Sequence, residues 1–210
     1  MSVRSNDSAG NNLVPPLPPQ APRMAPSPWL EALGRAVLRL GGWRVEGAFP
    51  DLPRLVVIAA PHSSNWDGIW GFAAKLALGI RLSVLGKHTL MRIPLLSAFL
   101  RWQGVIGVDR AAPQGVVEQA VALLRRPGSL WYAIAPEGTR KPVARWKPGF
   151  WRIARGAGVP VLAVAFDYPH RRIVIGPVFT PGEDMDADIA RIQRWYAPFK
   201  GRCHDVVQPG

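Results

Sequence analysis

The stretch RLVVIAAPHSSNWDG, residues 54–68, contains the transition that decides the fold class. Residues 55–60 are apolar throughout, which predicts a β-strand that is covered on both of its faces. A polar turn follows, and either Ser64 or Asn65 in that turn can cap a helix over residues 65–78. We therefore expect a strand, a short polar turn and a helix in direct succession.

The same succession recurs along the rest of the chain. Alternation of strands and helices predicts an α/β fold, with a largely parallel mixed sheet flanked by helices. In such sheets, binding and catalytic sites form in the loops that follow the carboxyl ends of the strands. Further strands are predicted at 81–86, 104–109, 129–135, 160–166 and 172–179, and further helices at about 94–102, 114–126, 147–157 and 185–197.

The composition is that of one globular domain with a strong positive charge. The chain has 210 residues, of which 48% are hydrophobic, and its formal net charge is +12. Only five of its 26 basic residues are lysines; the others are arginines. Such an excess of positive charge favours anionic partners: phospholipid headgroups, phosphorylated metabolites or nucleic acid.

The N-terminal part differs from the rest in composition. Residues 1–28 include the proline-rich run LVPPLPPQAPRMAPSP, which predicts a disordered tail. Residues 29–44 follow as an amphipathic helix with arginines on its polar side. Trp29, Leu33 and Val37 are candidates for contact with a membrane interface. The alternative is a helix that only packs on the core, and the pattern does not decide between the two.

Several features predict a cytoplasmic protein that does not span a membrane. No apolar run reaches the roughly 18–20 residues that a transmembrane helix needs. The start, MSVRSNDSAGNN, lacks the apolar core of a secretory signal. Cys203, in the expected C-terminal tail at 201–210, is the only cysteine, so no intrachain disulfide can form. That composition suits a reducing compartment.

His62 and Asp67 are the first candidates for catalysis. His62 follows the first strand, and Asp67 falls in the first turn of the helix. The chain can bend between them and bring the carboxylate to one imidazole nitrogen, which leaves the other nitrogen to accept a proton. The plain alternative is a polar turn before a helix. The other histidines, His88, His170 and His204, have no acid at the same offset, and we expect them to be structural or exposed.

Two further strand ends carry polar residues. Arg110 closes the segment VDR after one predicted strand, and a guanidinium there can grip a phosphate with two donors. Its alternative is an ion pair at the strand end that involves Asp109.

The segment APEGTR, residues 135–140, follows another strand. Gly138 permits a tight turn, Thr139 offers a hydroxyl, and Arg140 adds a second guanidinium. Glu137 can hold an arginine in place or accept a hydrogen bond from a substrate hydroxyl. As a third polar strand end in one sheet, this segment indicates that the three loops converge on one site.

Taken together, these segments resemble the glycerolipid acyltransferase family, whose best-known members acylate lysophosphatidic acid. Four blocks occur in the family's order, and the resemblance covers roughly residues 45–180. The stretch GKHTLMRIPLLSAFLRWQG upstream of the second block, which includes Lys87, also looks like the family. The matching residues are His62 and Asp67 in a His-x4-Asp block, with Ser64 at its usual place; Asp109 and Arg110; Pro136 to Arg140; and Val159 with Pro160.

The resemblance implies direct acyl transfer from a thioester in phospholipid biosynthesis. His62 would act as the base, Asp67 would orient it, and no enzyme nucleophile, metal or cofactor would be needed. The donor would be acyl-CoA or acyl-acyl carrier protein. The acceptor would be 1-acylglycerol-3-phosphate, at the cytoplasmic face of a membrane. The acyltransferase domain would span residues 45–200. The implied acceptor-binding residues are Lys87, Arg110, Glu137, Gly138, Thr139 and Arg140.

The sequence departs from the family pattern around the acceptor site, at Pro61, Gly107, Ala135, Lys141 and Ala163. Another lyso-lipid, such as lyso-ornithine lipid, therefore stays open as the acceptor. A basic module that binds nucleic acid or membrane without catalysis is a further alternative, although no zinc-ligand spacing or reader motif is present. A serine hydrolase is a poorer one, because the Gly-x-Ser-x-Gly motif is absent.

Overall fold

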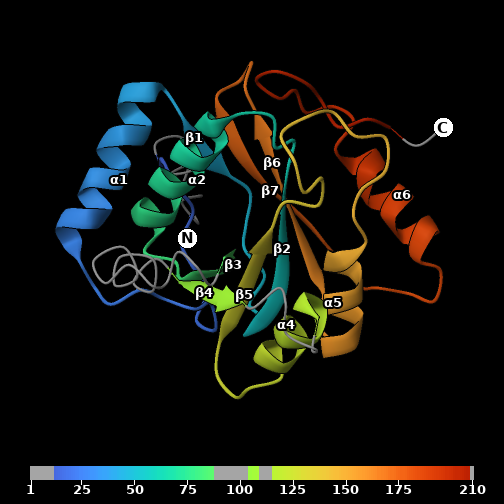
Figure 1. Ribbon diagram of the computed structural model, residues 1–210. Helices are drawn as coiled ribbons and strands as arrows, with labels where there is room; N and C mark the ends of the chain where they lie inside the picture. The colour runs from blue at the N-terminus through green and yellow to red at the C-terminus, as the bar shows by residue number, and fades with distance from the viewer. Residues whose placement is uncertain (1–11, 88–103, 109–114, 209–210) are drawn as a thin grey trace, which may run out of the picture.

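A computed structural model of the protein describes residues 12–87, 104–108 and 115–208. In these ranges the chain forms a seven-stranded sheet with helices on both faces, which confirms the predicted α/β class (Figure 1). The strand order is β1-β7-β6-β2-β5-β3-β4. All neighbouring strands are parallel except β6 and β7, which are antiparallel. The strands are β1 (Arg44–Glu46), β2 (Arg54–Ala60), β3 (Leu82–Lys87), β4 (Val105–Val108), β5 (Leu130–Ile134), β6 (Val161–Asp167) and β7 (Arg172–Phe179).

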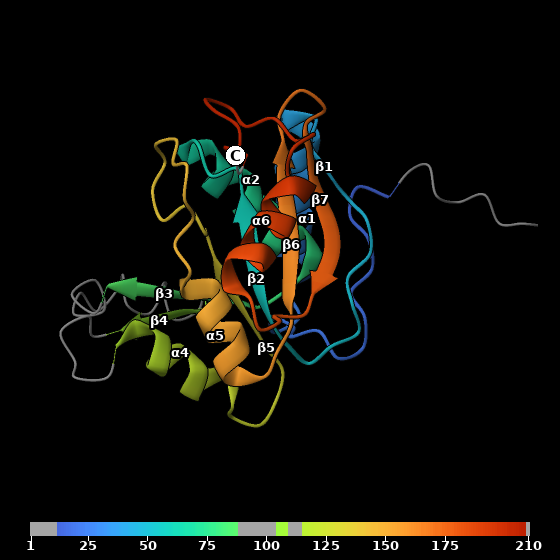
Figure 2. The same cartoon turned by 90° about the vertical axis from the view of Figure 1, so that its right-hand side faces the viewer.

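The helices form two layers, one on each face of the sheet. Helices α1 (Pro28–Gly41) and α2 (Asn65–Leu78) cover one face. Helices α4 (Val116–Leu124), α5 (Gly149–Ala157) and α6 (Met185–Trp195) cover the other, as the two views show (Figure 1, Figure 2).

Strand β2 shows why the apolar run at 55–60 folds as a central strand. Its side chains alternate between the two faces, so Leu55 and Val57 pack under α1 and α2, while Val56 and Ile58 pack under α4, α5 and α6. All four are at most 5% exposed. A strand with helices on both faces must be apolar at every position, as this one is.

The helix pair α1 and α2 is packed closely enough to require a glycine. Gly34 lies at the crossing, and a Cβ atom there would come within 2.4 Å of the backbone nitrogen of Ala77. Leu38 from α1 is fully buried in the core beneath the pair. Among the described residues, none of the helices is long and apolar enough to cross a bilayer.

The predicted elements agree with the structure to within one or two residues at most ends. Helix α2 covers residues 65–78 as expected, while the helix expected from residue 29 begins at Pro28 and ends at Gly41. The short strand β1 was not predicted, because three residues carry no clear periodicity. The helix expected at about 94–102 lies outside the described residues.

The expectation of a disordered N-terminal tail does not hold for residues 12–28. Val14 and Ala21 are each only 5% exposed and join the core under α1 and α2. The N–H of Val45 donates a hydrogen bond to the carbonyl of Leu13 at 2.9 Å, and the N–H of Arg81 to that of Pro22 at the same length. Prolines fix the backbone φ angle, so ordering such a segment loses little conformational entropy.

The expected C-terminal tail also packs on the domain over its described part. Val206 is 6% exposed and belongs to the core under α6. The side-chain amide of Gln193 donates to the carbonyl of Val207 at 3.3 Å. The segment after α6 therefore returns to the sheet instead of leaving the molecule.

Candidate active site

The site lies at the carboxyl ends of three adjacent parallel strands. Ile58 of β2 pairs with Ile134 of β5 on one side and with Ala163 of β6 on the other. Because the three strands run in the same direction, the loops that follow them meet at one edge of the sheet. These loops carry His62 after β2, residues 135–140 after β5 and Tyr168 after β6.

His62 and Asp67 form the predicted pair. Nδ1 of His62 lies 3.3 Å from Oδ2 of Asp67. Ser64 is the N-cap of α2, and its N–H donates to the same oxygen of Asp67 at 2.8 Å, which places Asp67 at the start of the helix and turns it back toward His62. Since Nδ1 faces the carboxylate, Nε2 is the nitrogen that can exchange a proton with a substrate. The His62 side chain is 29% exposed, so a substrate can reach it.

Asp67 is held in its ionised form by its surroundings. The residue is only 2% exposed, and burial alone raises the pKa of a carboxyl group. Hydrogen bonds from His62, the Tyr168 hydroxyl and the Ser64 N–H outweigh that effect and lower the pKa of Asp67 below its usual value. A buried negative charge beside the imidazole stabilises the imidazolium that forms when His62 takes a proton.

Glu137 has a different place from the one expected. It is only 2% exposed, and its Oε2 accepts a hydrogen bond from the backbone N–H of His62 at 2.9 Å. Its other oxygen, Oε1, is buried without a hydrogen-bond partner among the described residues. Burial raises the pKa of Glu137. The side chain therefore braces the loop that carries His62, and it does not hold an arginine in the described part of the chain.

Gly138, Thr139 and Arg140 form the turn beside this brace. Gly138 has a φ angle of +64°, a backbone conformation that favours glycine. Oγ1 of Thr139 accepts a hydrogen bond from the N–H of residue 141 at 3.2 Å, which closes the turn. The exposed Arg140 donates through Nη1 to Oδ1 of Asn65, in the first turn of α2. This contact joins the β5 loop directly to the helix that bears Asp67.

Of the expected site residues, Lys87 is described only by its backbone and Arg110 is not described. Lys87 ends β3, which is parallel to both β5 and β4, so its backbone lies toward the same edge of the sheet. The position of its side chain is not described. Arg110 lies outside the described residues.

The serines next to His62 are occupied by structural hydrogen bonds. Ser63 is 5% exposed, and its Oγ accepts from the N–H of Arg202 at 3.0 Å and from that of Cys203 at 3.2 Å. Oγ of Ser64 accepts from the N–H of Trp66 at 3.3 Å as part of the helix cap. Neither arrangement resembles an activated nucleophile, which argues against the hydrolase alternative.

The structure adds Tyr168 and the C-terminal segment to the site, and sequence reasoning missed both. The Tyr168 hydroxyl donates to Oδ1 of Asp67 at 2.5 Å. Nε2 of His204 lies 3.0 Å from the carbonyl oxygen of Arg140. The position of Tyr168 directly after a predicted strand was the one available signal. His204 sits in the segment expected to be a free tail, so nothing in the sequence indicated it.

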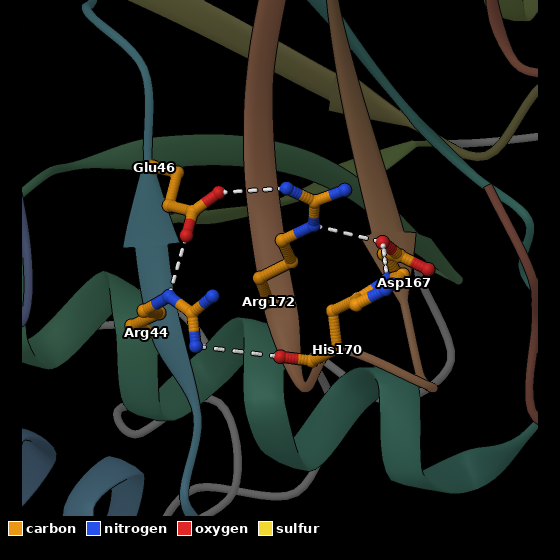
Figure 3. Close-up of polar contacts among 5 residues, drawn as sticks. All are labelled: Arg44, Glu46, Asp167, His170 and Arg172. Atoms are coloured by element: carbon orange, nitrogen blue, oxygen red, sulfur yellow. Dashed lines mark hydrogen bonds and ion pairs between the residues drawn. The ribbon is translucent and has the colours of Figure 1, made fainter. Parts of the chain in front are cut away.

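A second histidine–aspartate pair lies at the same edge of the sheet, where β6 ends and β7 begins (Figure 3). Oδ2 of Asp167 is 2.7 Å from Nδ1 of His170 and 2.8 Å from Nε of Arg172. Arg172 also contacts Glu46 at 3.0 Å, and Glu46 contacts Arg44 at 2.5 Å. These five side chains form a continuous chain of polar contacts across β1, β7 and the end of β6. Among the described residues, no group of three or more His, Cys, Asp or Glu side chains is arranged to hold a metal.

The fold and the site define a class of enzyme. A partly exposed imidazole is backed by a buried carboxylate at the end of a central parallel strand, and a glycine turn beside it presents an arginine. That arrangement suits general-base activation of a hydroxyl group in a substrate that carries negative charge.

Comparison with known proteins agrees with this class. A sequence profile of the family described as Acyltransferase matches residues 45–167, which is more than half of the chain. The chain therefore belongs to the Acyltransferase family and is an acyltransferase, which agrees with the resemblance to the glycerolipid acyltransferases. The crystal structure of the 1-acyl-sn-glycerophosphate (LPA) acyltransferase PlsC from Thermotoga maritima has the same fold. It aligns with a TM-score of 0.58 at 20% sequence identity, over 80% of this chain and 76% of that one. Curated protein sequences gave no significant match.

Proposed function

We propose that the protein transfers a fatty acyl group from a thioester to the hydroxyl of a lysophospholipid in phospholipid biosynthesis. The donor is acyl-CoA or acyl-acyl carrier protein, and the acceptor is 1-acylglycerol-3-phosphate. The observation that carries the proposal is the His62–Asp67 pair, with Arg140 held against the same helix by Asn65. A base and a phosphate-binding cation on adjoining strand ends fit an acceptor that has both a hydroxyl and a phosphate.

The reaction needs one general base and no covalent intermediate between the acyl group and the enzyme. Nε2 of His62 takes the proton of the acceptor hydroxyl while that oxygen attacks the thioester carbonyl carbon. The carbon–sulfur bond then breaks, and the imidazolium returns the proton to the leaving thiolate, so that a thiol and an ester result. Asp67 keeps the imidazole oriented and stabilises its positive charge. Holding the two substrates together supplies a large part of the acceleration.

Arg140 is the described residue best placed to bind the acceptor's phosphate. Its side chain is exposed, and its guanidinium lies at the first turn of α2 through the contact with Asn65. Gly138 and Thr139 shape the turn that presents it. Lys87 and Arg110, each at or after the end of a parallel strand, are proposed as further phosphate ligands.

The surface of the helix pair supports a location at a membrane. Trp29, Leu33 and Leu40 are 68%, 47% and 89% exposed, and their spacing of four and seven residues places them on one side of α1. Val37, expected to join them, is half-buried and packs on the core instead.

Helix α2 carries further exposed apolar side chains next to the active site. Trp66, Ile69 and Phe72 are 43%, 45% and 37% exposed, and Trp66 directly precedes Asp67. The guanidinium of Arg202 lies 5.2 Å from the ring centre of Trp66 and adds positive charge there. We propose that this face binds an anionic bilayer, at its cytoplasmic side, so that the lipid acceptor reaches His62 from the membrane.

An apolar cavity supports the binding of a fatty chain. It has a volume of about 110 Å³ and lies between α2 and the sheet. Its lining includes Ala59 of β2 and Gly71 of α2, the strand and the helix that are joined by the turn bearing His62.

The decisive experiment offers purified protein a panel of lyso-lipids with labelled acyl-CoA and acyl-acyl carrier protein, on anionic and neutral vesicles. We expect the acylation of 1-acylglycerol-3-phosphate to exceed that of the other acceptors and to be faster on anionic vesicles. Preferred acylation of lyso-ornithine lipid would replace the acceptor but keep the reaction. No acyl transfer to any lyso-lipid, together with tight binding of nucleic acid, would overturn the proposal.

The role of Arg140 is tested by Arg140→Ala. Loss of the guanidinium should raise the KM of the acceptor by about tenfold or more and change that of the donor much less, because a charge-assisted bond to phosphate is worth roughly 1.5–3 kcal/mol. Arg145→Ala is the matched control, since that side chain is 82% exposed and contacts Asp186. Equal increases in both KM values would argue against a phosphate contact.

A further inference from the structure

The backbone and the ring of Tyr168 are both held in place, in addition to the contact of its hydroxyl with Asp67. Its backbone N–H donates to the carbonyl of Lys200 at 2.9 Å, which ties it to the segment after α6. Its ring packs edge-on against Trp43 with centroids 4.9 Å apart. The hydroxyl then donates to Oδ1 of Asp67 at 2.5 Å. A phenol held in this way has little freedom to leave the carboxylate.

The two oxygens of Asp67 have separate partners. Oδ1 accepts from Tyr168, whereas Oδ2 faces both the Ser64 N–H at 2.8 Å and Nδ1 of His62 at 3.3 Å. A carboxylate can rotate about its terminal torsion, and that torsion has a broad preference. Anchoring Oδ1 fixes the plane of the group and keeps Oδ2 directed at the imidazole.

We propose that Tyr168 is a positioning residue for the catalytic pair and acts on His62 through Asp67. This inference rests on the proposed role of His62 as the base. Tyr168 does not itself exchange a proton in the reaction: burial, followed by the hydrogen bond to Asp67, raises the pKa of its hydroxyl well above the usual value. The phenol therefore stays neutral and donates to the carboxylate over the working range of pH.

Tyr168→Phe tests the proposal because it removes the hydroxyl and keeps the ring against Trp43. We expect kcat to fall about 5- to 50-fold, with the KM values of donor and acceptor changed by less than about twofold, since the substrates' contacts are untouched. The pKa of the Asp67 carboxyl, followed by carbon-13 NMR, should rise because one of the hydrogen bonds that lower it is lost.

Tyr196→Phe is the matched control for a purely structural effect. Tyr196 is fully buried on the other face of the sheet, and its hydroxyl contacts the backbone of β2 and β6. Its loss should lower the unfolding temperature while kcat and the pKa of Asp67 stay unchanged.

The outcomes separate the inference from the proposed function. If His62→Ala is inactive but Tyr168→Phe keeps native kcat and an unchanged Asp67 pKa, the positioning role is refuted and the base stands. A similar loss of kcat in Tyr168→Phe and Tyr196→Phe would also refute it. If His62→Ala keeps native turnover, His62 is not the base and the proposed function is refuted. The carbon-13 titration still decides whether the Tyr168 hydroxyl lowers the pKa of Asp67.

Discussion

Two histidine–aspartate pairs lie at the carboxyl ends of β2 and β6, and both have an imidazole nitrogen close to a carboxylate oxygen. His62 lies 3.3 Å from Asp67, and His170 lies 2.7 Å from Asp167. Both carboxylates are buried, at 2% and 1% exposed. The closer pair is not the one in the family's first block, so proximity alone does not identify a catalytic base.

The pairs differ in what else each carboxylate binds. Asp167 shares its Oδ2 between His170 and the guanidinium of Arg172, so a permanent positive charge already compensates it (Figure 3). Among the residues that the structure describes, the partners of Asp67 other than His62 are an N–H and a phenol, which are neutral. The negative charge of Asp67 is thus left for the imidazolium of His62.

Exposure adds to this difference. The His170 side chain is 64% exposed, against 29% for His62. Water screens a charge on His170 far more than one on His62. This difference supports the proposal that His62 is the base, because the other hydrogen bonds of Asp67 do not neutralise its charge and the imidazole is partly exposed to substrate.

The largest expected effect separates the two histidines directly. His62→Ala should lower kcat by about 10²–10⁴-fold and leave the protein folded, because it removes the proposed base. His170→Ala should keep kcat within about twofold and change stability by no more than about 1 kcal/mol, because the imidazole is largely exposed and Arg172 still contacts Asp167. Steady-state kinetics and circular dichroism on both variants check this, and equal losses of kcat would erase the distinction.

Substitution of the Asp67 carboxylate is expected to have a smaller effect on kcat than loss of His62. Asp67→Asn should lower kcat roughly 10- to 10³-fold, because the amide is neutral and cannot stabilise the imidazolium. Asp167→Asn should leave kcat per folded molecule near the native value. Active-site concentration must be measured in both, so that partial unfolding is not mistaken for lost catalysis. A catalytic defect in the folded Asp167→Asn protein would show that the two sites are coupled.

Much of this site follows from local sequence. His62, Ser64 and Asp67 lie within six residues, and their arrangement depends only on where a strand ends and a helix begins. That boundary was predictable because the apolar run changes to a capping residue there. The glycine turn at residues 135–140 was predictable in the same way. Parallel strands then bring the two loops to one edge, so the convergence also followed from the fold class.

The rest depends on contacts between distant residues. Tyr168 is 101 residues from Asp67, and only the pairing of β2 with β6 brings it close. Glu137 was expected to hold an arginine or to accept a hydrogen bond from a substrate hydroxyl, but the buried side chain accepts from the backbone N–H of His62. The proline-rich segment was expected to be disordered because composition does not show that Val14 finds a gap in the core. Sequence periodicity reports which residues are apolar, not which distant partner they meet.

The smallest expected effect concerns stability rather than activity. Burial alone would raise the pKa of Asp167, but hydrogen bonds from Arg172 and His170 lower it below the usual value. A carboxyl group with a lowered pKa in the folded state stabilises the protein above its unfolded pKa of about 3.9 and loses that contribution as the pH falls through the folded value. Asp167→Asn should therefore reduce the free energy of unfolding by about 1–3 kcal/mol at pH 7.

Urea denaturation at several pH values measures this contribution. The difference in the free energy of unfolding between native protein and Asp167→Asn should be constant above about pH 5 and shrink below about pH 4, because the carboxyl is protonated in the unfolded state before it is protonated in the folded state. Asp186→Asn is the matched control, because its ion pair with Arg145 joins side chains that are 72% and 82% exposed. That variant should differ from native protein by less than about 0.5 kcal/mol. A difference for Asp167→Asn that stays constant down to pH 3 would mean that packing and not the charge network makes Asp167 important, and the two carboxylates would then differ in more than their partners.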